Sequence, residues 1–313
     1  MQEIQVTDRA GGHVLTNIGV WSPDGRWIVY DTRSDPAGEN FDGDTIEIVH
    51  VHSGEVREIY RARHGAHCGV ATFSPTAEKV VFILGPEHPT DDWQYSAAHR
   101  QGVVVELERP GLAVPLDARD VTPPFTPGAL RGGTHVHVFS GDGGDDAWVS
   151  FTYDDCVLES NQRNVGVSFL GRGVVVPKHH PRNHDGSAFS VLVTRTVHEP
   201  RPGSDEMSRA FEDAWVGTHG YFRPDGTRQR RAIAFQGNVV TSGGQTISEA
   251  FLVDLPDDVT QSGDAPLEGT PTTRPAPPRG TVQRRLTHTA GCKYPGLQGP
   301  RHWLRSSPDG SRI

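Results

Sequence analysis

Residues 20–33 read VWSPDGRWIVYDTR, in which two apolar segments flank the tetrapeptide Ser22–Gly25. Proline suits the second position of a type I turn because its ring fixes the backbone angle, and aspartate and glycine suit the next two positions. After the turn, apolar and polar side chains alternate, which is the period of a strand with one buried face. The segment therefore predicts a β-hairpin.

The same arrangement recurs along the chain in altered form. Each time, an apolar or aromatic residue precedes a turn and an alternating apolar strand follows it. The repeats are FSPTAEKVVF (73–82), FSGDGGDDAWVSF (139–151), FRPDGTRQRRAIAF (222–235) and SSPDGSRI (306–313). Four strands in a repeat of roughly 40 residues are typical of a β-propeller blade. We therefore predict one all-β propeller domain over residues 1–313, with insertions between some blades.

The segment PGSDEMSRAFEDAWVG, residues 202–217, departs from the strand pattern. Ser204 suits a helix N-cap, and two acidic residues follow it in what would be the first turn. Apolar side chains then fall at helical spacing. They are Met207, Ala210, Phe211, Ala214 and Trp215. The segment predicts a short amphipathic helix, inserted between blades and covering one face of the propeller.

The composition restricts the class of function. The 313 residues carry a net charge of −9, so no broad basic face is available for a phosphate backbone and we expect no nucleic-acid partner. The three cysteines are widely spaced, which is atypical of a disulfide framework or a thiolate zinc site. The chain has no nucleophile elbow, P-loop or dinucleotide fingerprint, so we expect no nucleotide cofactor.

The two ends of the sequence give further expectations. The first residues lack a cationic start followed by an apolar core, and no apolar run approaches the roughly 20 residues of a spanning helix. We therefore expect a cytoplasmic protein without membrane contact. At the other end, SSPDGSRI should lead into a strand, and a propeller must close to remove its strand edges. We expect the chain to be truncated there.

The repeats resemble those of TolB-like β-propellers. The whole chain resembles the uncharacterised bacterial propeller proteins of the YidR type. The matching segments are FDGDTIE (41–47), YRARHGAHCGV (60–70), LRGGTHVHVFS (130–140), PGSDEMSRAFEDAWVG (202–217) and APPRGTVQRRLT (276–287). This resemblance implies six to seven blades in the intact protein and a C-terminus longer than the present one. It implies no activity.

Two segments are similar, more distantly, to oligogalacturonate lyases: HCGVATFSPTAEKVVFILGPEHPTDDW (67–93) and GGTHVHVFSGDG (132–143). This resemblance implies a divalent metal ion, such as manganese or zinc, bound by His67, His135 and His137. It also implies cleavage of acidic sugar oligomers by β-elimination. The sequence departs from that family where Leu84-Gly85-Pro86 replaces a Glu-Gly-Pro pattern, and no glutamine matches the metal-binding one.

His135 and His137 lie two positions apart in a predicted strand. Side chains at this spacing point to the same face of a regular strand, so both could bind one metal ion. Alternatively, their imidazoles form hydrogen bonds with neighbouring strands or water. His50 and His52 have the same spacing, so the spacing alone does not identify a metal site. The segment KHHPRNHDG, residues 178–186, is predicted to be a surface loop.

Elimination from an acidic sugar also needs a cation beside the carboxylate and a base for the adjacent proton. Arg131 is the candidate for binding the carboxylate, because a planar guanidinium can donate two parallel hydrogen bonds. Lys178 is the candidate base. His99 is the alternative base, and Arg100 and Arg163 are weaker candidates for binding the carboxylate. The alternative for each of these side chains is a surface ion pair.

Two functions are consistent with these residues. The first is a metal-dependent lyase-like enzyme that acts on an acidic oligosaccharide. The second is a non-catalytic propeller that binds a protein, peptide or glycan on its face. Trp93, Tyr95 and Trp303 suit either function, because both sugars and peptides pack on aromatic rings.

Overall fold

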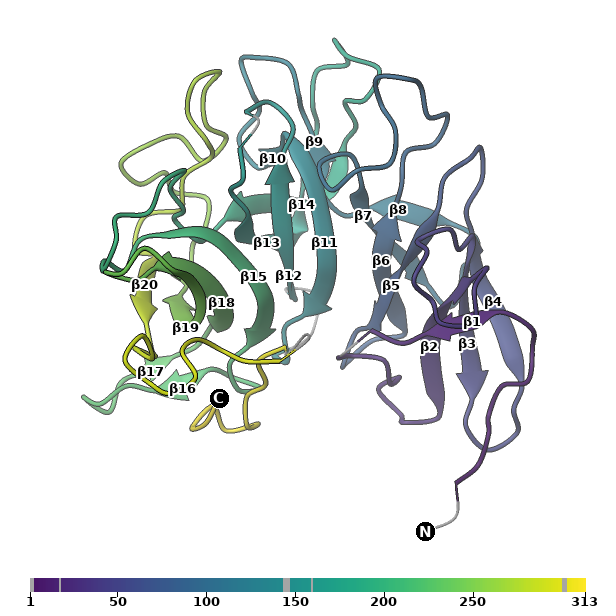
Figure 1. The fold of residues 1–313 in the computed structure, drawn as a ribbon. Helices are drawn as coiled ribbons and strands as arrows, with labels where there is room; N and C mark the ends of the chain where they lie inside the picture. Colours follow the sequence, from purple (N-terminus) through teal and green to yellow (C-terminus); the bar gives the residue numbers. More distant parts are fainter. Residues whose placement is uncertain (1–2, 17, 143–146, 159, 300–302) are drawn as a thin grey trace.

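β-Strands account for the regular secondary structure in the computed structural model, which describes residues 3–16, 18–142, 147–158, 160–299 and 303–313. No α-helix occurs within these ranges. Four antiparallel sheets of four strands follow one another in chain order along an arc, from the purple N-terminal sheet to the green and yellow C-terminal one (Figure 1). The prediction of an all-β chain is confirmed, and the arrangement is consistent with a β-propeller-like fold.

Each four-stranded sheet is a meander. The first contains β1 (Gly12–Val14), β2 (Trp27–Arg33), β3 (Thr45–His50) and β4 (Val56–Arg61). The second contains β5 (Cys68–Phe73), β6 (Lys79–Leu84), β7 (Gln101–Glu106) and β8 (Ala113–Pro115). The third contains β11 (Gly132–Phe139), β12 (Trp148–Asp155), β13 (Asn164–Val174) and β14 (Gly186–Leu192). The fourth contains β15 (Met207–Trp215), β18 (Ala232–Val240), β19 (Thr246–Asp254) and β20 (Val282–Arg285).

Two short pairs of strands complete the fold. β9 (Ala118–Arg119) and β10 (Ala129–Leu130) pair in parallel beside β14. β16 (Tyr221–Phe222) and β17 (Arg228–Gln229) form a hairpin inserted between β15 and β18. The Arg-Pro-Asp-Gly turn forms the predicted hairpin, but it joins β16 to β17 and does not lead directly into β18.

Apolar side chains fill the spaces between neighbouring sheets. One cluster joins the first and second sheets through residues such as Val29 and Phe82. A second joins the second and third sheets, and includes Val81 and Val149. A third joins the third and fourth sheets. Burying one such side chain stabilises the fold by about 1.5–3 kcal/mol.

The first strands of the second, third and fourth sheets each contain a β-bulge at the same place. The register shifts around Val70 in β5, Val136 in β11 and Glu212 in β15. These three residues have positive φ angles of 59°, 53° and 54°, which are unusual for residues other than glycine. A bulge adds one residue to a strand, so the side chains that follow it point to the other face.

The prediction of a helix over residues 202–217 is wrong, because Met207–Trp215 forms strand β15. The register of β15 shifts twice, between Met207 and Arg209 and between Phe211 and Ala214. Each bulge lengthens the spacing between buried side chains from two residues to three or more. The buried residues Met207, Ala210 and Ala214 therefore have the spacing of a helical face although they lie on a strand.

Candidate functional site

A cleft of about 720 Å³ lies between two long loops, one joining β6 to β7 and the other joining β13 to β14. We call it the Trp93 cleft. Its rings and positive charges come from Trp93, His99, Arg119, His180, Arg182 and His184. Its size is within the range of cavities that bind small molecules.

The indole of Trp93 lies at the centre of this group. The His99 ring stacks on it with the centroids 3.8 Å apart and the planes 15° apart. The guanidinium carbons of Arg119 and Arg182 each lie 5.7 Å from the indole centroid, within the range of a cation–π interaction. The buried indole Nε1 has no hydrogen-bond partner among the described residues. A donor of this kind needs an acceptor from water or a ligand.

Arg182 connects the two loops of the cleft. Its guanidinium donates hydrogen bonds to the carbonyl oxygens of Glu87, at 2.8 Å, and His88, at 2.9 Å. In the part of the chain that the structure describes, no ion pair includes Arg182 or Arg119. The lining also contains the carboxylates of Glu87 and Asp92, and the buried Asp117 interacts with Arg119. Because neither guanidinium forms a direct ion pair, both keep donors that an anionic ligand can use.

Arg119 forms the inner wall of the cleft and is only 3% exposed. Its Nη2 donates to the carbonyl oxygen of Arg100 at 2.6 Å, while its buried Nε has no partner among the described residues. The backbone of Arg119 exchanges two hydrogen bonds with that of His184, at 2.9 and 3.1 Å. This pairing connects the strand after β8 to the loop before β14, and it places His184 beside the guanidinium.

His184 is a neutral imidazole with a defined tautomer. Burial, and then the charge of Arg119, lowers the pKa of His184 to about 3. Its Nδ1 lies 3.2 Å from the carbonyl oxygen of Asp185, so Nδ1 carries the proton that is donated to this oxygen. The buried Nε2 is then unprotonated and has no partner among the described residues. It can accept a hydrogen bond from a ligand or a water molecule.

A buried acid lies behind Arg119. Asp117 is fully buried, and its Oδ1 accepts hydrogen bonds from the Gly102 N–H at 3.0 Å and the Thr134 hydroxyl at 3.3 Å. Burial raises the pKa of Asp117 to about 6. A side chain on Gly102 would not fit, because a Cβ there would lie 2.4 Å from His137 Nε2 and 2.8 Å from Asp117 Oδ1. His137 and Asp117 therefore converge on the backbone of β7.

The expectation that His135 and His137 share one face of a strand is wrong. Because the bulge at Val136 lies between them, His135 stands opposite Thr152, whereas His137 points to the other face. There its ring centroid lies 6.2 Å from that of Phe151. Both ring nitrogens of His137 are buried without a hydrogen-bond partner among the described residues, and burial lowers the pKa of His137 to about 3.

His67 immediately precedes β5, and its Nδ1 is buried without a hydrogen-bond partner among the described residues. Within the described ranges, no group of three or more His, Cys, Asp or Glu side chains is arranged to hold a metal ion. The histidines that the lyase resemblance implies as ligands of manganese or zinc thus do not form such a group with one another.

The two predicted catalytic residues do not line the Trp93 cleft. Arg131 is 1% exposed and donates two hydrogen bonds to Asp155 Oδ2, at 3.1 and 2.8 Å, and a third to the Thr270 carbonyl oxygen at 2.6 Å. The carboxylate that Arg131 binds therefore belongs to the chain itself. Lys178 is exposed and forms an ion pair with Asp185.

Comparison with known proteins places the chain in a family. The family described as "Protein of unknown function (DUF3748)" matches residues 67–184. The protein "Uncharacterized protein YidR" of Escherichia coli strain K12 is 49% identical over 318 aligned residues, which cover 99% of this chain and 72% of the relative. The chain belongs to the YidR family. Its resemblance to YidR-type proteins is thereby confirmed.

In this YidR-family chain, the segment that matches the family description contains the whole Trp93 cleft, whose lining runs from Gly85 to His184. The described ranges contain no helix that is long and apolar enough to cross a membrane.

Sequence reasoning singled out neither Arg119 nor Arg182. The available signal was the repeated occurrence of histidine, arginine and tryptophan in the segments 88–100 and 178–186. The segment 178–186 was predicted to be a surface loop. That prediction did not indicate that it packs against the segment 88–100.

Proposed function

We propose that this YidR-family chain forms part of a β-propeller of six to seven blades, and that the Trp93 cleft binds an acidic oligosaccharide. One observation carries the proposal: the guanidinium carbons of Arg119 and Arg182 both lie 5.7 Å from the centroid of the Trp93 indole, and among the described residues neither guanidinium forms an ion pair within 4 Å. Because His99 already covers one face of the indole, a sugar ring can pack only against the part of the indole that His99 leaves open, and the guanidinium groups can then bind the carboxylates of the sugar.

The hydrogen-bonding groups of the cleft also favour a polar ligand over an apolar one. Trp93 Nε1 and Arg119 Nε are buried donors without protein partners in the described ranges, and His184 Nε2 is a buried acceptor. An apolar ligand would leave all three groups unpaired, at a cost of about 1–3 kcal/mol for each. A sugar has the hydroxyl groups and ring oxygen that satisfy both donors and acceptors.

The unpaired Nε2 of His184 favours a second candidate function, which is cleavage of the same ligand by β-elimination. With a pKa of about 3 this imidazole is a weak base, so the reaction depends on Arg119 neutralising the carboxylate and thereby making the adjacent C–H bond more acidic. In this reaction Nε2 takes the proton from the carbon next to the carboxylate of a uronate. The C–H electron pair forms the carbon–carbon double bond, the glycosidic C–O bond breaks, and the leaving oxygen receives a proton from water. Arg119 stabilises the negative charge that develops on the carboxylate. The implied metal ligands do not form one group, so no step is assigned to a metal ion.

Calorimetric titration with trigalacturonate tests the binding function. The methyl ester of the same oligomer is the matched control ligand, because it keeps the sugar rings and loses the charges. We expect trigalacturonate to bind at least tenfold more tightly than the ester, since charge-assisted hydrogen bonds contribute about 1.5–3 kcal/mol each. Arg182→Ala should remove most of this preference for the acid over the ester. Trp93→Ala should weaken the binding of both ligands. Equal affinity for the acid and the ester would overturn the proposal.

The elimination is tested separately by the ultraviolet absorbance of the unsaturated product. His184→Gln should abolish product formation while trigalacturonate still binds. Binding without product in the wild-type chain would leave a non-catalytic acidic-glycan binder and would exclude the lyase.

A further inference from the structure

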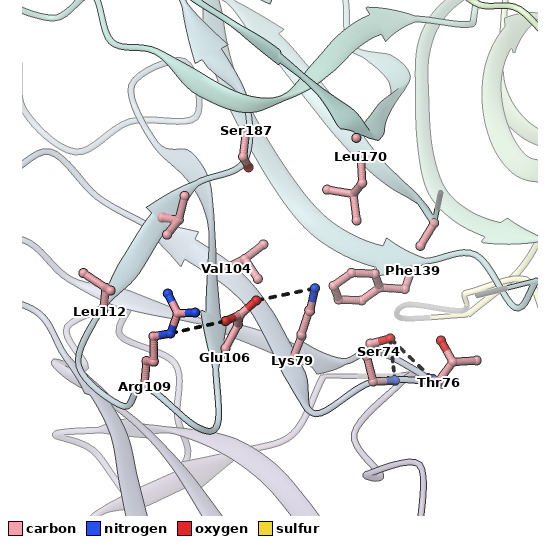
Figure 2. Close-up of a pocket in the computed structure, with 14 residues that line it drawn as sticks. Ser74, Thr76, Lys79, Val104, Glu106, Arg109, Leu112, Phe139, Leu170 and Ser187 are labelled. Atoms are coloured by element: carbon pink, nitrogen blue, oxygen red, sulfur yellow. Dashed lines mark hydrogen bonds and ion pairs between the residues drawn. The ribbon is translucent and has the colours of Figure 1, made fainter. Parts of the chain in front are cut away.

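A second cavity, of about 530 Å³, lies between the second and third sheets (Figure 2). One wall comes from β6, β7 and β8, and the other from the end of β11 and from β13. In Figure 2 the side chains of Val104 and Lys79 face those of Leu170 and Phe139 across the space. No described residue lines both this cavity and the Trp93 cleft, so we treat the two as separate sites.

The cavity carries a small cationic cluster on one wall. Glu106 lies between Lys79 and Arg109, with nitrogen–oxygen distances of 3.5 and 3.8 Å. These distances exceed those of charge-assisted hydrogen bonds, which are about 2.7–2.9 Å. Both cations therefore keep donors that an incoming anion can use. Among the described lining residues, two cations and one carboxylate give a net charge of +1.

The rest of the lining is largely apolar. Phe139 and Leu170 come from the third sheet, and Val104 comes from β7. At the rim, Leu112 and Val114 stay 54% and 45% exposed. Covering such side chains contributes about 25 cal/mol for each Å² removed from water. An apolar cavity with a cationic cluster on one wall matches a ligand that has one anionic end and an apolar chain.

A peptide strand is a poor fit for this cavity. β8, the edge strand on this side, has three residues and ends at Pro115, which has no N–H to donate. The carbonyl oxygen of Pro115 already accepts a hydrogen bond from the Ser187 hydroxyl at 2.9 Å. An added strand would thus find few backbone partners.

We propose that this cavity binds a medium-chain acyl carboxylate. The carboxylate lies between Lys79 and Arg109 and accepts hydrogen bonds from both, and the acyl chain packs between Val104 and Leu170 with its outer part covered by Leu112. A neutral chain of the same length would leave the cationic donors unpaired, and a cationic one would be repelled by the net positive charge.

Calorimetric titration of the full chain with decanoate, below its micellar concentration, tests the site. We expect one decanoate per chain. Decanol should bind at least tenfold more weakly and decyltrimethylammonium should not bind, because loss of two charge-assisted hydrogen bonds removes most of the affinity. Equal binding of decanoate and decanol, or no saturable binding of decanoate, would overturn the proposal.

Variants locate the binding on the molecule. Arg109 is exposed, so the Arg109→Ala variant should fold normally. It should weaken the binding of decanoate at least tenfold without changing the binding of decanol. Glu106→Gln should increase the affinity for decanoate, because it removes the carboxylate that competes for both cations. Arg182→Ala, in the Trp93 cleft, is the matched control and should leave decanoate binding unchanged. If Arg182→Ala weakens the binding of decanoate and Arg109→Ala does not, the carboxylate binds outside this cavity and the proposal fails.

Discussion

His137 and Asp213 occupy equivalent positions in different sheets, each directly after the positive-φ residue of a bulge. Both side chains are fully buried. Burial disfavours the charged form of any group, so it lowers the pKa of His137 to about 3 and raises that of Asp213 to about 7. The two residues differ in chemistry but are both held close to their neutral forms by the same feature of the strand.

Replacement of Asp213 by asparagine should stabilise the fold most at alkaline pH. The pKa of its carboxyl is about 7 in the folded chain against an ordinary value of 3.8, so the folded state keeps a proton that the unfolded state releases. Stability from this group is therefore lost as the pH rises from about 4 to about 7. Relative to wild type, Asp213→Asn should gain about 2 kcal/mol more at pH 8 than at pH 5.

Urea unfolding at the two pH values measures this difference. Asp257→Asn, which changes an exposed carboxyl, is the control and should show no such dependence on pH. An Asp213→Asn effect of equal size at pH 5 and pH 8 would mean that the carboxyl is ionised in the folded chain.

Single residues of the site were the hardest to predict from the sequence. Arg131 was chosen because a guanidinium can bind a carboxylate, and it does bind one, but the partner is Asp155 of the same chain. Arg182 has no motif around it. Its importance depends on contacts with Glu87 and His88, about ninety positions earlier. No local pattern contains that information.

At the scale of elements, turns were predictable and bulged strands were not. The Ser-Pro-Asp-Gly turn forms as expected, with hydrogen bonds from Gly25 N–H to the Ser22 oxygen and from Ser22 N–H to the Trp27 oxygen. Turn chemistry is local, so the sequence contains its cause. A bulge instead changes the period of a strand, and this change made β15 resemble a helix and placed His135 and His137 on opposite faces.

The bulge in β5 gives a test of its local strain. Val70 is a β-branched residue with a φ of 59°, a conformation that disfavours side chains branched at Cβ. Val70→Gly should change the free energy of unfolding by less than about 1 kcal/mol, because relief of strain offsets the added freedom of the unfolded chain. Val80→Gly, at a fully buried position of regular strand β6, should cost about 3–4 kcal/mol.

Thermal or urea unfolding of the two variants checks this comparison. A loss at Val70 as large as that at Val80 would show that the side chain of Val70 stabilises the bulge instead of straining it.

At the scale of the whole molecule, the turn-and-strand repeats of the sequence predicted the sheets. The Trp93 cleft instead depends on how neighbouring sheets pack against each other. Each meander comes from one continuous segment, and its alternating pattern can be recognised there. The Trp93 cleft comes from the β6–β7 loop of the second sheet and the β13–β14 loop of the third. Loops of two sheets meet only after both sheets pack together, so a pattern within either loop could not predict the cleft.

Packing between sheets also predicts which part of the molecule opens first when one contact is lost. Asp31 of the first sheet accepts a hydrogen bond from the Val70 N–H of the second at 2.8 Å and pairs with Arg33 at 2.7 Å, with both side chains of the ion pair buried. Asp31→Ala leaves Arg33 buried without its partner and the Val70 N–H without an acceptor. Removing one partner of a buried pair costs about 3–5 kcal/mol. In such an array each sheet contacts mainly its neighbouring sheets. The lost stabilisation should therefore weaken chiefly the contact between the first and second sheets.

Hydrogen exchange should therefore accelerate in β2 and β3 of the Asp31→Ala variant and stay nearly unchanged in β12 and β13. Glu108→Ala is the matched control, since it removes an exposed carboxylate from the turn between β7 and β8 without affecting this contact, and its exchange should equal that of wild type. A uniform acceleration in all four sheets would mean that they unfold as one unit and that the Asp31 contact stabilises the whole fold. Acceleration confined to the first sheet would show that Asp31 stabilises the contact between this sheet and the second one.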